Sequence, residues 1–175
     1  MAAARALTAG KRRDRKEVRI IRKLQIVALT VVRIGLGIFW LWQQTWKPPP
    51  AFGCPTEGFC YWLDQEIQHP LIPLYADFLR TVVRPQAYVF GWITLLTETA
   101  IGLSFLLGAL TRLGGLVGTL WSLNLLVGLI RVPGEEAWYY IGMVLVNCLY
   151  LVVGGSSQLS VDRAKGWRNW LARAD

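Results

Sequence analysis

The sequence predicts an all-α membrane protein, a four-transmembrane-helix bundle with a helical extracytoplasmic cap loop. Of the 175 residues, 54% are hydrophobic, which is more than an ordinary soluble domain carries. These residues gather in four runs whose length, about 18–25 residues, crosses roughly 30 Å of hydrocarbon as a helix. A long amphipathic loop separates the first two runs. The four predicted spans are approximately residues 24–46, 88–110, 113–130 and 138–154.

The basic residues predict how the chain is oriented. Nine Lys and Arg precede the first span, and Arg112 with four residues of the tail brings the total on that side to fourteen. The opposite side has four, although it carries the longest loop. The positive-inside rule therefore predicts a multi-pass protein of the cell membrane with both termini in the cytoplasm. Head groups of the lipid bilayer, and no nucleic acid, are the expected partners of these flanks.

This distribution divides the chain into three predicted parts. Residues 1–23 form a basic cytoplasmic N-terminal arm, and residues 156–175 form a basic cytoplasmic tail. Residues 24–155 form the four-helix transmembrane domain, with its outer loop at about 47–87.

The outer loop is expected to fold as a cap. "KPPP" after Trp46 ends the first helix, because prolines lack the amide donor and clash with the preceding turn. "FCYWLDQEIQ" and "LYADFLRTVV" then read as two short helices with mixed apolar and charged faces, separated by "HPLIP". Such a cap either covers the helix ends or offers a binding platform, and both interpretations stay open.

Two cysteines lie in this loop on the predicted outer side, where disulfides persist. Five residues, including Pro55 and Gly58, separate Cys54 from Cys60, so a structural disulfide that closes a small ring is expected. Their spacing differs from the C-x-x-C of thioredoxin-like sites. Cys148, inside the fourth span, is interpreted as a small packing residue.

Each predicted span carries one polar residue near its middle: Arg33, Glu98, Asn124 and Asn147. Counting 1.5 Å per residue places all four at roughly 10–18 Å above the cytoplasmic boundary, so they can converge if they face inward. Charges in lipid are costly, which suggests that Arg33 and Glu98 form an intramembrane ion pair. Two meanings stay open: a structural pair that fixes helix register, or a polar pocket that holds a quinone carbonyl or relays a proton.

Several segments together resemble the DoxX/DoxD-like membrane proteins, the family of the small subunit of thiosulfate:quinone oxidoreductase. "RIGLGIFWLWQQTWK" is similar to the family's first-span signature, an arginine and paired glycines followed by aromatics and a lysine. "FLRTVVRPQAYVFGWITLLTETAIGLSFLLGALTR" is similar to its next block, and "GGSSQLSVD" to its ending. The resemblance covers about residues 33–162. It implies a four-helix membrane subunit associated with redox complexes, with Arg33, Lys47, Glu98 and Asp162 as the matching polar positions.

The cofactor inventory is short. His69 is the only histidine, so one copy of the chain cannot supply a bis-histidine haem or a multi-histidine metal site. We expect no metal and no covalently bound cofactor. If this chain handles electrons, a mobile quinone or a partner must carry them.

The sequence favours an integral membrane subunit of a redox complex that interacts with quinone in electron transfer. In this hypothesis Arg33 and Asn124 donate hydrogen bonds to a quinone carbonyl, Glu98 handles the proton, and Asn147 and Trp42 are further ligand contacts. Other membrane or peripheral redox subunits are the expected partners. The alternative is a non-catalytic structural or assembly subunit of a larger membrane complex. A small-molecule or proton carrier fits less well, since four spans show no inverted repeat.

Overall fold

The fold is a bundle of four long helices covered at one end by two short ones. In this computed structural model the described residues are 2–154 and 160–161, with side chains described from residue 17 onward. The bundle consists of α1 (Ala2–Trp42), α4 (Ala87–Leu107), α5 (Thr111–Leu129) and α6 (Ala137–Val153). The short helices are α2 (Gly58–Gln68) and α3 (Pro73–Phe78). The described part of the chain contains no strand, so the all-α prediction is confirmed.

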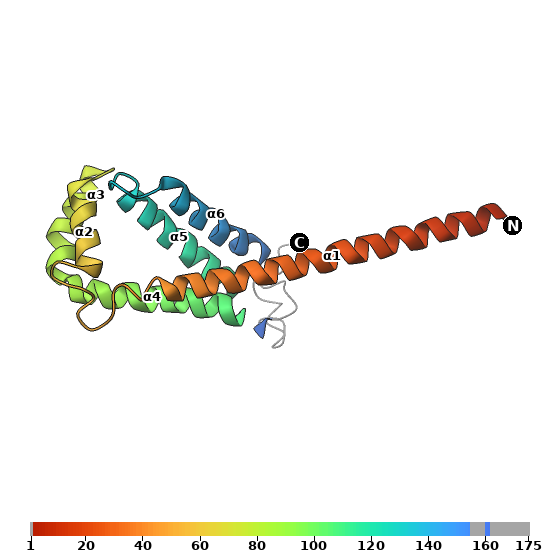
Figure 1. The fold of residues 1–175 in the computed structure, drawn as a ribbon, viewed down its shortest axis with the longest axis horizontal. Coiled ribbons are helices and arrows are strands. Elements are labelled where there is room, and N and C mark those ends of the chain that lie inside the picture. The colour runs from red at the N-terminus through yellow and green to blue at the C-terminus, as the bar shows by residue number, and fades with distance from the viewer. Residues whose placement is uncertain (1, 155–159, 162–175) are drawn as a thin grey trace.

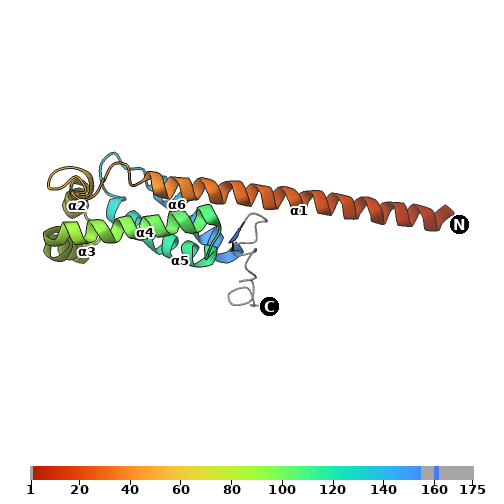
Figure 2. The same ribbon diagram turned by 90° about the horizontal axis from the view of Figure 1, so that it is seen from below.

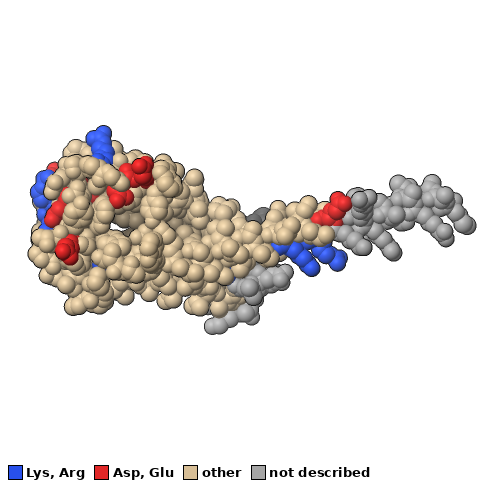
Figure 3. Space-filling view, in the orientation of Figure 1, with Lys and Arg blue, Asp and Glu red and all other residues tan. Residues whose placement is uncertain are grey.

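Helix length and composition agree with a membrane protein. Three helical stretches, Glu17–Trp42, Pro73–Leu107 and Thr111–Leu129, are long and apolar enough to cross a membrane. The fourth bundle helix, α6, is a shorter apolar helix of 17 residues. Charged side chains gather toward the two ends of the described part of the molecule, and the visible surface between them is uncharged (Figure 3). The molecule is therefore an all-α membrane protein.

The four long helices form two close pairs that together make a V. Helix α1 packs along α4, and α5 packs along α6 (Figures 1 and 2). The two pairs meet near the end from which the N-terminal part of α1 projects, and they diverge toward the end where α2 and α3 lie (Figure 1). We call these the terminal end and the cap end. The cap, residues 43–86, closes the wide end of the V.

Close backbone contact explains why α1 and α4 pair so tightly. A methyl group on Gly37 would lie 2.8 Å from the backbone nitrogen of Leu106 and 2.9 Å from the carbonyl oxygen of Gly102. Neither backbone atom can move aside without shifting its helix, so only glycine fits at position 37. Such small residues let membrane helices approach closely.

The cap is built from the two predicted short helices, but the second is not separate from the bundle. After α3 the chain continues through a π-helical turn (Leu79–Val83) and a 3-10 turn (Arg84–Gln86) directly into α4. Pro85 lies in the 3-10 turn, where its missing amide and its ring interrupt regular helix. A bend therefore carries the chain from the cap into α4 without a loop.

Local contacts hold the remainder of the cap in place. Arg84 pairs with Asp64 of α2 through two contacts, Nε to Oδ1 at 2.7 Å and Nη2 to Oδ2 at 3.0 Å. A disulfide joins Cys54 to Cys60. The ring of Phe52, which is fully buried, packs against Gly91 of α4. The segment after α1 is thereby fixed against the start of α4.

Toward the terminal end the helices enclose a filled core. Its large buried side chains are Leu36, Trp40, Ile101, Phe105 and Tyr150. A polar group lies within it: Trp40 Nε1 donates to Asn147 Oδ1 at 3.3 Å, and Asn147 Nδ2 donates to Ser122 Oγ at 3.2 Å. Asn147 Nδ2 also lies 2.8 Å from the carbonyl oxygen of Met143. These bonds join α1, α5 and α6 at one level.

Candidate functional site

A buried ion pair lies at the wide end of the V. Lys47 Nζ is 2.6 Å from Glu98 Oε1, and the two side chains are only 5% and 2% exposed. Lys47 comes just after α1, where Pro48 follows, and Glu98 lies midway along α4. The Lys47 ammonium also lies 4.5 Å from the centre of the Trp46 ring. Burial lowers the pKa of Lys47, and the Glu98 carboxylate offsets part of that change.

The predicted pairing of Arg33 with Glu98 was wrong. The Arg33 side chain, 1% exposed, instead reaches Gly108 and Ser160 at the terminal end. Gly108 follows Glu98 by ten residues, so roughly 15 Å of α4 separate the two levels. Side chains on a helix lean toward its N-terminus, and α1 and α4 run in opposite directions. Arg33 therefore leans toward the terminal end and Glu98 toward the cap end. Their backbones also lie at different levels, because Gly37, four residues beyond Arg33, packs beside Gly102 and Leu106 of α4.

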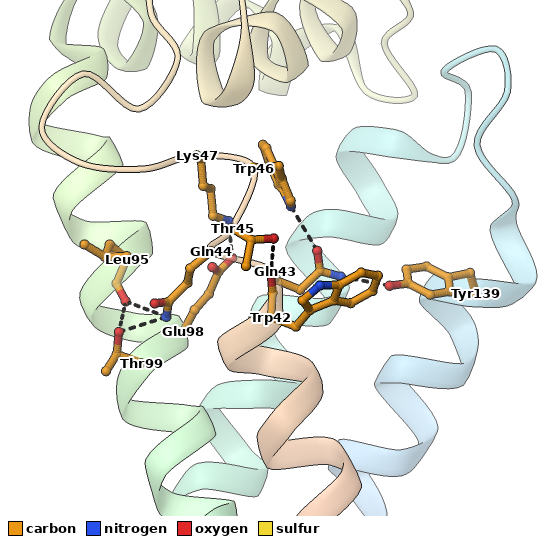
Figure 4. A network of polar contacts seen from close by, with 10 residues as sticks. All are labelled: Trp42, Gln43, Gln44, Thr45, Trp46, Lys47, Leu95, Glu98, Thr99 and Tyr139. Carbon is orange, nitrogen blue, oxygen red and sulfur yellow. Dashed lines mark hydrogen bonds and ion pairs between the residues drawn. The ribbon is translucent and has the colours of Figure 1, made fainter.

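Amide side chains fasten the end of α1 beside the ion pair (Figure 4). Gln44 Nε2 donates to Thr99 Oγ1 of α4 at 2.8 Å. Gln43 Nε2 donates to the Tyr139 hydroxyl of α6 at 2.8 Å, and Gln43 Oε1 accepts from Trp46 Nε1 at 3.1 Å. The end of α1 is thus bonded to both helix pairs, which positions Lys47.

The ion pair borders a cavity of about 850 Å³ between the two helix pairs and beneath the cap. Its lining is mostly apolar and aromatic, with a few polar groups, as is common for small-molecule sites. All four bundle helices or their ends contribute, as do α2 and α3. Polar side chains in the lining include Lys47, Glu66, Tyr75, Glu98, Trp121 and Asn124.

Two polar atoms at this cavity have no hydrogen-bond partner among the described residues. They are the acceptor Glu98 Oε2 and the donor Trp121 Nε1, both buried. The indole lies near the Glu98 carboxylate but does not reach hydrogen-bond geometry. Unsatisfied buried polar groups are rare in folded proteins and often mark a binding role. A buried donor and a buried acceptor therefore lie next to each other at the cavity wall.

A second polar cluster lines the cavity at the cap. Glu66 of α2 is 8% exposed, and its Oε2 lies 3.2 Å from the Tyr75 hydroxyl. The same hydroxyl lies 3.2 Å from Asn124 Oδ1 of α5. Burial raises the pKa of Glu66 to about 7, although the hydrogen bond from Tyr75 lowers it in part. Of the four polar residues predicted to converge, this cavity brings together Glu98 and Asn124.

Other predicted site residues lie elsewhere. Asn147 is fully buried in the core with its amide bonded to Trp40 and Ser122, and it does not line the cavity. Trp42 is 65% exposed on the outside of α1 and does not line the cavity either. Asp162 lies outside the described residues. Among the residues that the structure describes, no cluster of three or more His, Cys, Asp or Glu could hold a metal ion.

Sequence reasoning missed three contributors to the cavity: Glu66, Tyr75 and Trp121. It also treated Lys47 as a loop charge, apart from its place in the resemblance. A usable signal existed for Lys47, because a lysine between a tryptophan and three prolines has little freedom to reach solvent. Glu66 and Tyr75 are on short amphipathic helices, whose buried face a sequence does not reveal.

The fold and this site define a class: a small all-α membrane protein with a roofed, largely apolar cavity that holds a buried ion pair. The comparisons agree with that class. The model of the family described as "TQO small subunit DoxD" matches residues 67–166, more than half of the chain. The chain belongs to this family of membrane subunits of a quinone oxidoreductase. No curated protein and no solved structure matched it.

Proposed function

We propose that this chain is the small membrane subunit of a quinone-linked oxidoreductase and that the quinone ring binds in the cavity beneath the cap. The observation that supports it most directly is the buried donor and acceptor, Trp121 Nε1 and Glu98 Oε2, left without partners at the cavity wall. A quinone offers a carbonyl acceptor, which suits the Trp121 donor. Its reduced quinol offers a hydroxyl donor, which suits the Glu98 acceptor.

The residues divide the work at this end of the cavity. Trp121 donates to the carbonyl oxygen of the quinone, and Glu98 accepts from the hydroxyl of the quinol. The Lys47 ammonium favours the ionised form of Glu98, whereas the apolar surrounding favours the neutral form. Quinone reduction takes up two electrons and two protons, and we assign the electrons to a partner subunit. This chain then binds and orients the ring and holds a proton-accepting group beside it.

The proposal includes a placement in the cell. The termini lie in the cytoplasm, as the basic flanks predict, and the cap faces the opposite side of the cell membrane. Membrane or peripheral redox subunits are the partners that deliver electrons. Arg33, which the sequence suggested as a quinone donor, is replaced in that role by Trp121, because Arg33 lies at the terminal end.

Quinone binding to the purified full chain tests the proposal. A short-chain quinone is titrated into the protein in lipid nanodiscs, and quenching of tryptophan fluorescence reports its affinity. Trp121→Phe keeps the ring and removes the N–H, so affinity should fall about tenfold, as expected for one hydrogen bond. Trp42→Phe is the matched control, because Trp42 faces away from the cavity. Unchanged affinity in both Trp121→Phe and Glu98→Gln would overturn the proposal.

A second candidate is a non-catalytic structural or assembly subunit. It is favoured by the bonds that fasten α1 to both helix pairs, Gln44 to Thr99 and Gln43 to Tyr139. In that case Glu98→Gln should weaken the bundle and its assembly with partner subunits, whereas quinone turnover per assembled complex stays normal.

A further inference from the structure

The cavity has a second polar end, formed by Glu66, Tyr75 and Asn124. These come from α2, α3 and α5, so the cap and the bundle meet there. Glu66 packs against Gly128, where a methyl group would lie 2.4 Å from Glu66 Oε2. No cation opposes the burial of this carboxyl among the described residues, in contrast to Glu98 with Lys47. The two acids at the cavity are therefore in different electrostatic surroundings.

The two ends lie apart along one face of α5. Trp121, Asn124 and Gly128 follow one another by three and four residues, so they share that face. Trp121 marks the Glu98 end, and Asn124, the ligand contact of the Glu66 end, follows it by three residues, which is roughly 4.5 Å along the helix. Two side chains on one helix face can thus each bond one oxygen of the same small ring.

The Tyr75 hydroxyl decides what this second end presents to a ligand. It has one proton but lies at 3.2 Å from two oxygens, Glu66 Oε2 and Asn124 Oδ1. When Glu66 is protonated, it donates to the Tyr75 oxygen and Tyr75 donates to Asn124 Oδ1. The Asn124 amide N–H groups then face the cavity as donors.

Ionised Glu66 reverses this chain of hydrogen bonds. The carboxylate can only accept, so it takes the Tyr75 proton as a hydrogen bond. Asn124 must then donate its amide to the Tyr75 oxygen, which leaves its carbonyl oxygen toward the cavity as an acceptor. The second end therefore changes from donor to acceptor when Glu66 loses its proton.

We propose that Glu66, acting through Tyr75, sets the hydrogen-bond polarity of Asn124 toward the second oxygen of a para-quinone. Protonated Glu66 favours the quinone carbonyl, and ionised Glu66 favours the quinol hydroxyl. This inference rests on the proposed function, because it concerns the same cavity. Glu66 is a positioning residue here and Asn124 is the ligand contact.

The other titratable groups that face Glu66 do not carry this change. Tyr75 of α3 and Tyr140 of α6 interact with Glu66, and Tyr140 is itself bonded to Glu135. The other charged groups that line the cavity are Lys47, Glu98 and Glu136. Ordinary tyrosine hydroxyls titrate near pH 10, well above the pH range in question. The raised pKa of Glu66, about 7, places its own titration where affinity can be measured.

The test measures the affinity of the full chain in nanodiscs for 1,4-naphthoquinone and for its quinol, which is kept reduced under anaerobic conditions. In the wild type, the ratio of quinone affinity to quinol affinity should fall about tenfold as pH rises through 7. Glu66→Gln keeps a hydrogen bond to Tyr75 but cannot ionise, so its ratio should not depend on pH. Tyr75→Phe should also lose the pH dependence, because it breaks the link to Asn124.

A single-carbonyl ring, α-tetralone, separates this inference from the proposed function. It engages only the Trp121 end, so its affinity should be independent of pH and should weaken with Trp121→Phe. A wild-type ratio that does not change with pH, while Trp121→Phe still weakens both rings, overturns the role of Glu66 alone. No effect of either Trp121→Phe or Glu98→Gln on either ring overturns the quinone site itself. Thermal unfolding of each variant shows that it is folded.

Discussion

Lys47 and Glu98 are 51 residues apart in the chain, yet their side chains meet at 2.6 Å with almost no exposure. Removing one member of a buried pair leaves the other charge unpaired, which costs about 3–5 kcal/mol, whereas removing both costs much less. Lys47→Met should therefore lower the thermal midpoint strongly, and the double variant with Glu98→Leu should recover most of the loss. Equal losses that simply add in the double variant would contradict the pairing.

The pH dependence of stability should reveal Glu66. Burial raises its folded pKa to about 7 from 4.5, so the folded chain keeps this proton over a range in which the unfolded chain has released it. The free energy of unfolding should then fall by about 3 kcal/mol as pH rises from 4.5 to 7, and level off above.

Comparison with Glu66→Gln isolates this contribution, because the other carboxyl groups are common to both proteins. The midpoint difference between variant and wild type should be near zero at acidic pH and favour the variant above pH 7. A difference that stays constant with pH would show that Glu66 ionises equally in the folded and unfolded chain.

Two glycines on α1 provide a matched pair for helix packing. Gly37 has the backbone of α4 within 2.9 Å of a methyl position, whereas nothing lies within 4 Å of Gly35. Gly37→Ala should destabilise the bundle by about 1–3 kcal/mol through overpacking. Gly35→Ala should be neutral or stabilise by up to about 1 kcal/mol, because alanine is the better helix former. Similar midpoints for the two variants would contradict the packing of α1 on α4.

Two asparagines should separate structure from binding. Asn147→Ala leaves the Trp40 indole and the Ser122 hydroxyl unpaired in the core, which costs about 1–3 kcal/mol for a buried group. Its quinone affinity should be unchanged when measured below the unfolding temperature. Asn124→Ala should weaken quinone affinity and leave the stability of the fold nearly unchanged, since Asn124 is exposed at the cavity. Titrations and thermal scans on both variants check this, and a binding defect confined to Asn147→Ala would contradict the site.

The fold followed from the sequence to a large extent because its signals are strong. Four apolar runs fix four helices, and the Pro133–Gly134 pair marks the turn before α6. The similar depth predicted for Arg33 and Glu98 was wrong, because Gly37 packs beside Leu106 and places Arg33 nearer the terminal end than Glu98. Side-chain direction adds to this separation: both side chains lean toward their own helix N-termini, and α1 and α4 are antiparallel, so the two charges diverge further.

The site was harder to predict because its residues come from the cap. Whether Lys47 points inward depends on the position of the end of α1. Hydrogen bonds from Gln43 and Gln44 to α6 and α4 fix that position. Glu66 enters the cavity because α2 packs against α5. The periodicity of apolar residues in the sequence does not predict this contact between distant helices. The second short helix was predicted as a separate piece of the cap, whereas the chain continues from it through the bend at Pro85 into α4.

A filled core lies between the cavity and the terminal end of the bundle. Leu36, Trp40, Ile101, Phe105 and Tyr150 occupy the terminal half of the bundle, and none of them lines the cavity. The core therefore separates the cavity, with Glu98 and Glu66, from the terminal end of the bundle. If quinone turns over at this cavity as proposed, the protons would be exchanged on the cap side of the membrane, so the orientation of the chain would set the sign of its contribution to the membrane potential.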